Sequence, residues 1–281
     1  MSSCFAADMS NQADYPLGAF NFDFARLGAD EASRVGELQS IGYGGMTLRV
    51  NTEKQLEELE RDQAVIGDGP FKVYAGFITI FFDKDLAVQN AYLDKVIQSL
   101  KKSDAKLWVI LRVKGGKKVE REQIVDFLRP LAERTKAAGV ELIIYPHWSG
   151  NNPLNVSLFE TAEDALPYLK EVQNGNVYLS LHLSHELLAG NGDRLDEIAA
   201  KIKPWLRLPS INGADIDPVN FDRGIIPLTE GDYDASKLLK ALKSVDYRGP
   251  VILHTWNLQK AAADHHHTSF KKYQEMVDTL D

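Results

Sequence analysis

The chain has 281 residues, 44% of them hydrophobic, and its 32 Lys and Arg against 40 Asp and Glu give a formal net charge of −8. This much apolar side chain supports a large folded core and excludes disorder as the main state. An acidic chain does not complement a phosphate backbone, so general nucleic-acid binding is not expected. Cys4 is the only cysteine, which excludes an intramolecular disulfide and a thiolate metal cluster.

The first residues contain neither the basic segment nor the full apolar segment of an export signal. Cys4-Phe5-Ala6-Ala7-Asp8 nevertheless resembles the end of such a signal, where small residues precede a cleavage point. Two interpretations of residues 1–15 stay open. They are a remnant of an export signal, which implies a periplasmic or exported protein, or the flexible start of a cytoplasmic one. Beyond them, no apolar run has the length that a membrane span requires.

Apolar runs rich in β-branched and aromatic residues alternate with segments of helical periodicity. The predicted strands are 19–25, 45–50, 72–82, 107–113, 141–147, 177–183, 206–211 and 251–254. The predicted helices are 30–41, 53–65, 86–103, 119–138, 162–173, 193–202, 235–244 and 269–280. Gly42, Gly139 and Asn174-Gly175 follow three of these helices, where a left-handed cap is common. Pro130 lies inside the fourth helix and predicts a kink or a break there.

Eight strand–helix pairs without a linker predict one α/β domain, a (β/α)8 TIM barrel over residues 16–281. The alternative is an open doubly wound sheet, but the glycine-rich turn that binds a dinucleotide is missing after the first strand. Residues 114–118 do not have the spacing of a phosphate-binding loop either. Active sites of TIM barrels lie at the carboxyl ends of the strands. Functional residues are therefore expected at the predicted strand ends.

Four of the seven histidines follow the predicted strands five, six and eight. They are His147, His182, His185 and His254. In a barrel these imidazoles face one basin, and because protonating all of them together is unfavourable, some must be neutral, hydrogen-bonded or metal-bound. One such histidine alone is usually structural, but four that converge favour a functional site. His265, His266 and His267 lie in a predicted polar loop, where we expect them to be solvated.

The connection after the predicted strand seven, residues 215–234, is longer than ordinary loops and favours a lid or functional segment. Glu230 is its best candidate for acid/base chemistry, and a solvated turn residue beside Gly231 is the alternative. Asp234 is expected to cap the helix that follows. Because Glu230 and His185 both lie in predicted loops, replacing either is expected to cost little stability.

These segments together resemble the xylose-isomerase-like barrel superfamily, a group of sugar phosphate isomerases and epimerases related to the apurinic endonucleases. The resemblance extends from residues 38–42 to the last helix, and its best local match is Leu228-Thr229-Glu230-Gly231-Asp232-Tyr233-Asp234. Tyr145-Pro146-His147-Trp148 with residues 211–215 is also similar to a bacterial branch whose relatives act on keto-sugars and keto-glycosides. The resemblance implies a barrel enzyme that acts on such substrates.

Metal-dependent epimerases of the superfamily place Glu, Asp, His and Glu at the ends of strands five to eight. The corresponding residues here are Tyr145, His182, Ser210 and His254, so no carboxylate remains. The resemblance implies that His182 and His254, with His147, His185 or Glu230, can still hold a divalent ion, and imidazole favours zinc, manganese, cobalt or nickel over magnesium. Whether a metal is bound stays open at this point.

The expected function is removal of a proton next to a sugar carbonyl, giving isomerisation, epimerisation or elimination of a glycosidic leaving group. His185 and Glu230 are the expected acid/base pair, and His147 is a further catalytic residue. The side chains expected to bind the sugar, by aromatic stacking or through its hydroxyls, are Arg112, Trp148, Asn212, Asp215 and Trp256. Phe22 is expected either to stack on the sugar or to pack in the core. The alternative function is a non-catalytic carbohydrate-binding barrel, which the loss of carboxylates favours.

Overall fold

The computed structural model describes residues 14–115, 117–150, 152 and 154–280. The predicted flexible segment at 1–15, with its possible export-signal remnant, lies outside these residues except for Asp14 and Tyr15. Tyr15 is buried, and its carbonyl oxygen accepts a hydrogen bond of 2.8 Å from the Tyr273 hydroxyl. Within the described residues, no helix is long and apolar enough to cross a membrane.

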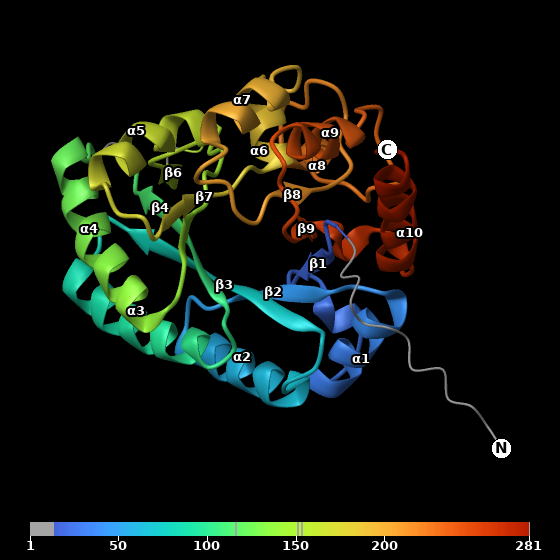
Figure 1. Ribbon diagram of the computed structural model, residues 1–281, viewed down its shortest axis with the longest axis horizontal. Helices are drawn as coiled ribbons and strands as arrows, with labels where there is room; N and C mark the ends of the chain where they lie inside the picture. Colours follow the sequence, from blue (N-terminus) through green and yellow to red (C-terminus); the bar gives the residue numbers. More distant parts are fainter. Residues whose placement is uncertain (1–13, 116, 151, 153, 281) are drawn as a thin grey trace.

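Parallel strands form a ring at the centre of the molecule (Figure 1). They are β1 (Leu17–Phe20), β2 (Gly45–Arg49), β3 (Lys72–Phe81), β4 (Lys106–Val113), β5 (Leu142–Ile144), β7 (Val177–Leu179), β8 (Ser210–Ile211) and β9 (Val251–Leu253). Their order is β7-β5-β4-β3-β2-β1-β9-β8, and the parallel bridges Leu179–Leu206 and His182–Ser210 connect the two ends. A short β6 (Val156–Ser157) pairs antiparallel with the end of β4. The predicted single-domain α/β barrel is confirmed.

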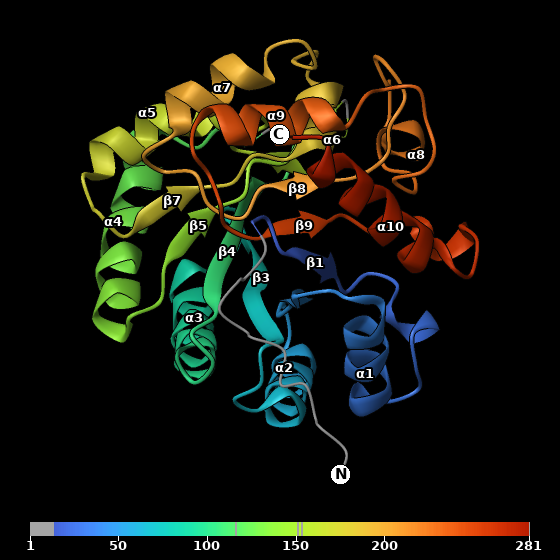
Figure 2. The ribbon, with the colours of Figure 1, turned by 45° about the vertical axis from the view of Figure 1, so that its right-hand side comes forward.

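Helices surround this ring. The long ones are α1 (Glu31–Ile41), α2 (Glu53–Ile66), α3 (Leu86–Lys101), α4 (Arg121–Ala138), α5 (Ala162–Val172), α7 (Leu195–Ile202), α9 (Ser236–Ser244) and α10 (His265–Asp278). Each contacts the next in this order, and α10 contacts α1, which closes the outer layer. Figure 2 shows α1 to α3 on one side of the strands and α9 and α10 on the other. The short α6 (Leu183–Leu188) and α8 (Phe221–Gly224) follow β7 and β8.

The helix ends agree with the sequence at two of the three predicted caps. Gly42 and Gly139 take the left-handed conformation after α1 and α4, as predicted. After α5 the left-handed residue is Gln173, with a φ of 53°, and not Asn174 or Gly175. Of the predicted kink or break at Pro130, the break is wrong, because α4 continues through this residue. Leu128 and Leu131 on either side are buried, and their packing holds the helix together despite the missing N–H donor.

The expectation that residues 265–267 form a solvated loop is also wrong. The last helix begins at His265, four residues earlier than predicted, and the side chains of His265 and His266 are buried. Nε2 of His265 lies 2.5 Å, and Nε2 of His266 3.2 Å, from Oδ2 of Asp23. Burial opposes the charge on Asp23, but the hydrogen bonds from the two imidazoles outweigh it and hold its pKa well below the usual range. This cluster ties the start of α10 to the segment after β1.

Aromatic side chains fill the interior of the barrel. Phe20, Phe77, Trp108 and Tyr145 belong to one buried cluster inside the ring of strands. The ring centroids of Trp108 lie 5.5 Å from Phe20 and 4.8 Å from Tyr145. A second and larger apolar cluster lies between strands and helices. The aromatic layer therefore forms a rigid floor beneath the strand ends, where functional groups are expected.

Candidate active site

A cavity of about 770 Å³ opens at the carboxyl ends of the strands. The residues that line it lie at or after the carboxyl ends of the strands. Examples are Arg49 at the end of β2, Phe81 at the end of β3 and His254 after β9. The charged and titratable side chains that line it are Arg49, Lys84, Arg112, Tyr92, Tyr145, His147, His185 and His254. This volume is within the range of pockets that enclose a small ligand.

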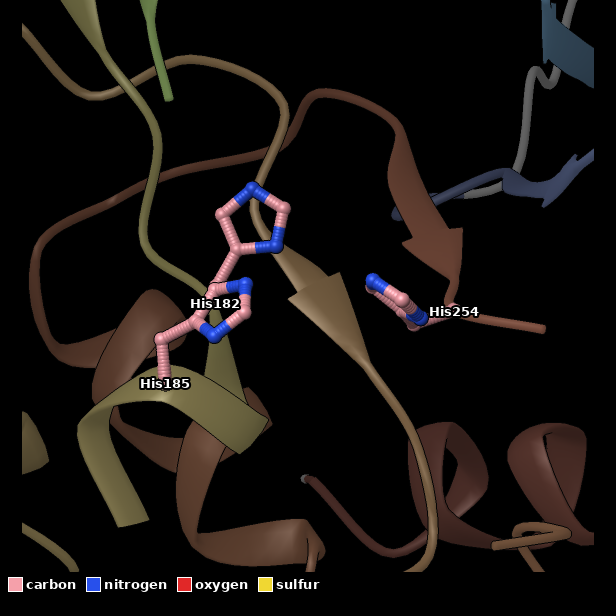
Figure 3. Close-up of side chains that lie close together, drawn as sticks. All are labelled: His182, His185 and His254. Carbon is pink, nitrogen blue, oxygen red and sulfur yellow. The ribbon is translucent and has the colours of Figure 1, made fainter. Parts of the chain in front are cut away.

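Four histidines gather at this cavity, as the strand ends predicted. His147, His185 and His254 line it, and His182 lies behind them with its ring stacked on Tyr145 at 3.7 Å between centroids. Figure 3 shows the rings of His182 and His185, from the start of α6, facing the ring of His254 at the end of β9. His185 is buried inside α6 and not in a loop. The premise of the expected low stability cost, that His185 lies in a loop, is therefore wrong.

The Tyr145 hydroxyl connects two of these histidines. It lies 3.1 Å from Nε2 of His254 and 3.3 Å from Nε2 of His185. The backbone N–H of Trp256 donates to Nδ1 of His254 at 3.3 Å, so the proton of that neutral ring is on Nε2. His254 then donates to the Tyr145 oxygen, and the hydroxyl hydrogen is directed to His185. The result is a chain of donors that ends at the cavity wall.

His147 stands apart from this chain. Its Nδ1 lies 2.7 Å from the backbone carbonyl oxygen of Trp148, which fixes the proton on Nδ1 because a carbonyl only accepts. The lone pair is therefore on Nε2, which has no hydrogen-bond partner among the described residues. The ring centroid of His147 lies 4.3 Å from that of His185. His147 thus presents a free basic nitrogen within a cavity that already contains a second imidazole.

Burial keeps the whole cluster uncharged. It lowers the pKa of His147 and His185 well below the usual range, and neighbouring charges, Arg112 among them, act in the same direction. Burial also lowers the pKa of His254 to about 3. The Tyr145 hydroxyl is affected in the opposite sense, since burial raises its pKa and keeps it protonated. At neutral pH the site therefore combines neutral imidazoles with a phenolic donor.

Three of these side chains fit a metal ion. His182, His185 and His254 each offer one nitrogen, and the three nitrogens lie within 4.8 Å of one another. Nε2 of His182 and Nδ1 of His185 are buried without a hydrogen-bond partner among the described residues. Three neutral imidazoles with an open fourth position form a common ligand set for catalytic zinc. The donor chain through Tyr145 engages both nitrogens of His254, so an ion would replace that chain and not coexist with it. His185 is one of the three further ligands that the sequence left open, and the group includes neither of the other two, His147 and Glu230.

The expected substrate-binding residues divide into two groups. Arg112, Trp148 and Trp256 line the cavity, and so does Phe22, whose ring lies 5.8 Å from that of His254. Asn212 and Asp215 do not line it. Nδ2 of Asn212 donates to the carbonyl oxygens of Gly213 and Gly224, each at 2.7 Å. Asp215 forms a two-point ion pair with Arg223. These contacts fasten the loop after β8.

The long loop after β8 brings an aromatic side chain to the site, and not Glu230. Phe221 lines the cavity and packs edge-on against Trp148 and Trp256, with centroids 5.4 Å and 5.3 Å away. Glu230 is exposed and does not line the cavity. Gly231 has a φ of 86°, and a Cβ there would lie 2.1 Å from the Ala214 carbonyl oxygen. The Glu-Gly-Asp segment thus shapes the turn that fixes the loop.

Sequence reasoning overlooked several lining residues. Tyr145 was recognised only as part of the strand-end pattern, although it connects two histidines. Arg49 and Lys84 follow the same rule at β2 and β3, and applying it to every strand would have found them. Phe221 gave no such signal, because its position depends on the path of the loop.

The chain belongs to the xylose isomerase-like TIM barrel family, whose sequence profile matches residues 37–273. No curated protein sequence matches it significantly. Among solved structures, it is similar to the IolI protein with a bound zinc atom, with a TM-score of 0.73 and 17% identity over 95% of this chain and 99% of that one.

Two sugar epimerases share the fold. A D-allulose 3-epimerase from Methylomonas sp. in complex with D-allulose has a TM-score of 0.71 and 15% identity, over 94% of this chain and 97% of that one. A 3-keto-D-glucoside 4-epimerase from E. coli has a TM-score of 0.69 and 14% identity, over 93% of this chain and 98% of that one. At these identities the likeness shows the shared barrel.

Proposed function

We propose that this protein is an enzyme of the sugar isomerase and epimerase type. Its reaction is the transfer of a proton at the carbon next to the carbonyl of a keto-sugar or keto-glycoside. The observation that carries the proposal is the set of buried, neutral imidazoles around Tyr145 at the wall of a cavity of about 770 Å³. Membership of the family and the sugar epimerases among proteins of the same fold support it.

His147 is the proposed base. Its Nδ1–H is held by the Trp148 carbonyl oxygen, so the Nε2 lone pair can accept a proton from the carbon beside the carbonyl. The electron pair of that C–H bond moves toward the carbonyl and leaves charge on its oxygen. The Tyr145 hydroxyl, which stays protonated, is the proposed donor to that oxygen, and its hydrogen then turns from His185 to the substrate. His185, beside both groups, is the proposed second acid/base residue.

The metal group gives the same site a further capacity. A zinc-type ion held by His182, His185 and His254 would supply a Lewis acid for the carbonyl oxygen. His147 lies outside that group, and its role as base does not depend on an ion. Trp148, Trp256 and Phe221 supply apolar surface for the C–H faces of a sugar ring.

A second candidate function is a barrel that binds sugars without reacting with them. The observation that favours it is the lining of the cavity, in which the described residues include no Asp or Glu. A carboxylate is a common base for such proton transfers, and here only imidazoles can take that role.

A panel of keto-sugars in deuterated water separates the two functions. Binding is measured by calorimetry, and deuterium incorporation beside the carbonyl is followed by NMR on the same samples. The proposal expects incorporation that depends on the protein for at least one sugar that binds. Sugars that bind and never exchange would support the binding barrel instead.

A further inference from the structure

Three cationic side chains line the cavity, although the chain as a whole is acidic. Arg49, Lys84 and Arg112 are all part of its lining, in a protein of formal net charge −8. Among the described residues, none of the three forms an ion pair with a carboxylate, and none of the residues that line the cavity is Asp or Glu. The cavity is therefore a local region of positive charge that lacks a counter-charge from the protein.

Arg112 is the innermost of the three. Its side chain is largely buried, its Nε has no hydrogen-bond partner in the described part of the chain, and burial lowers its pKa. A largely buried guanidinium whose Nε is unpaired is costly, and an anionic ligand would supply the missing counter-charge. Arg112 has the planar geometry that binds two oxygens of a carboxylate or phosphate at once.

The other two cations are held at the mouth of the same cavity by aromatic rings. The guanidinium of Arg49 lies 5.3 Å from the ring centroid of Phe22, and the ammonium of Lys84 lies 4.3 Å from that of Phe81. Phe22 and Phe81 line the cavity as well. These contacts keep two exposed and flexible side chains close to the cavity wall.

The cations and the histidines occupy different arcs of the barrel. Arg49 and Arg112 are on β2 and β4, which flank β3, and Lys84 follows β3. His147, His185 and His254 follow β5, β7 and β9. A ligand in the cavity therefore meets positive charge on one side and neutral imidazoles on the other.

We propose that the substrate of this site carries an anionic oxygen group, a carboxylate or a phosphate, bound by Arg112 together with Arg49 and Lys84. Its carbonyl end then lies against the histidines. This inference rests on the proposed function, because it assigns a substrate class to the same site. Carboxylate and phosphate both present anionic oxygens to these cations, and the test below distinguishes the two groups.

Calorimetry with three ketoses tests the inference: neutral D-fructose, D-fructose 6-phosphate and 5-keto-D-gluconate. At least one anionic sugar is expected to bind about tenfold tighter or more than D-fructose, with an affinity that falls as salt rises. The tighter of the two identifies phosphate or carboxylate as the group. Equal affinity for all three sugars would overturn the inference.

Substitutions locate the effect. Arg112→Met is expected to remove the preference for the anionic sugar, while Arg121→Met, in a surface ion pair with Glu171, leaves it unchanged. Arg49→Gln and Lys84→Gln change exposed side chains, so they test the site even if Arg112→Met does not fold. They are expected to weaken anion binding by roughly threefold each. A preference that survives all three cavity substitutions would place the anion elsewhere and refute the proposal.

Deuterium exchange on the same samples separates this inference from the proposed function. Tight binding of an anionic sugar without exchange would support the anion site and contradict the enzyme. Equal exchange on neutral and anionic ketoses, with equal affinity, would support the enzyme and overturn the anion site.

Discussion

The chemistry of the site depends mainly on burial. Burial is the largest cause of the lowered pKa of His147, His185 and His254, ahead of any neighbouring charge. A neutral imidazole keeps both a donor and an acceptor, so each ring can take part in a directed hydrogen bond. Carboxylates in the same positions would need counter-ions to remain buried. Histidine therefore suits the buried arc of this cavity, where the side chains stay neutral before any proton is transferred.

Tyr145→Phe tests the connection between the histidines. The substitution removes the hydroxyl between His254 and His185 and leaves the aromatic packing in place. We expect turnover to fall by about 10²-fold, the lower range for an acid/base group, and the free energy of unfolding to fall by about 1 kcal/mol. Turnover and urea denaturation are measured on the same preparation.

Tyr233→Phe is the matched control, since its hydroxyl donates to the Gly192 carbonyl oxygen at 2.6 Å and does not line the cavity. Tyr233→Phe is expected to lower the free energy of unfolding about as much as Tyr145→Phe does and to keep the wild-type turnover. If both variants lost turnover equally, the effect of Tyr145 would be structural, and its proposed role as donor would be abandoned.

At the scale of the elements, the start of α10 depends on one buried carboxylate. Asp23 accepts a hydrogen bond from His265 and lies 3.2 Å from Nε2 of His266, although both histidines are far from it in the sequence. Asp23→Asn removes the negative charge that both imidazoles face. We expect it to lower the free energy of unfolding by about 3 kcal/mol, as for other broken buried pairs. Urea denaturation monitored by circular dichroism gives the value.

Asp193→Asn is the comparison for that experiment, because its ion pair with Lys237 is exposed. This substitution is expected to lower the free energy of unfolding by no more than about 1 kcal/mol. Equal costs for the two substitutions would show that the cluster around Asp23 does not hold α10.

Asp62 links α1 and α2 and predicts a dependence of stability on pH. Burial raises its pKa from 3.8 to about 6, although Arg34 lies 3.6 Å away. The folded protein therefore binds a proton that the unfolded chain has released between these two pH values. Stability must fall as pH rises through this range, by up to about 3 kcal/mol from this group.

Asp62→Asn removes that titration. At about pH 7.5 the variant is expected to be more stable than the wild type by about 1–3 kcal/mol, and the difference should shrink at about pH 4. Urea denaturation of both proteins at the two pH values measures it. A difference that does not change with pH would mean that folding does not shift the pKa of Asp62, and would contradict the prediction.

The sequence predicted most of these elements because each carries its own periodicity. The long helices agree to within a few residues except α10, whose start depends on contacts with Asp23. The short helices α6 and α8 were not predicted. Strands β5 and β7 end earlier than predicted, at Ile144 and Leu179. The next residues keep the apolar character of a strand but leave the ladder and turn toward the site. An apolar pattern alone does not distinguish a residue inside the ladder of strands from one that has left it and turned toward the site.

The same difference between strand ends and the segments beyond them explains which residues of the site the sequence predicted. The strand-end rule found the four histidines, Arg112 and the two tryptophans, because strand direction alone carries them to one face. It did not determine which loop residues reach the cavity. The path from Asn212 to Asp234 is fixed by contacts across the loop, such as the Asp232 carboxylate accepting from the Ile216 N–H at 2.6 Å. That path brings in Phe221 and leaves Glu230 exposed.

For the whole molecule, the three histidines that fit a metal ion predict which ions stabilise the folded protein. His182, His185 and His254 come from segments that meet only in the closed barrel, so an ion bound there stabilises the folded state. Zinc at about 100 times its Kd is expected to raise the free energy of unfolding by about 2.7 kcal/mol. Magnesium prefers oxygen ligands and is expected to raise it little. Thermal melts of the chelated protein with each ion measure the effect.

His254→Gln is expected to abolish the zinc effect, and His267→Gln, at an exposed position of α10, is the control. Elemental analysis of the purified protein complements the melts. Stabilisation by magnesium alone, or zinc stabilisation that survives His254→Gln, would contradict the assignment of this group.

The most direct test of the account is the exchange of substrate hydrogen with deuterated water at saturating ketose. We compare the wild type with His147→Gln and with His267→Gln as control. We expect the wild type and the control to exchange the hydrogen beside the carbonyl. His147→Gln should still bind the sugar but exchange it about 10²- to 10⁴-fold more slowly. Exchange by His147→Gln at the wild-type rate would contradict the proposed base, and binding without exchange by the wild type would contradict the enzyme itself.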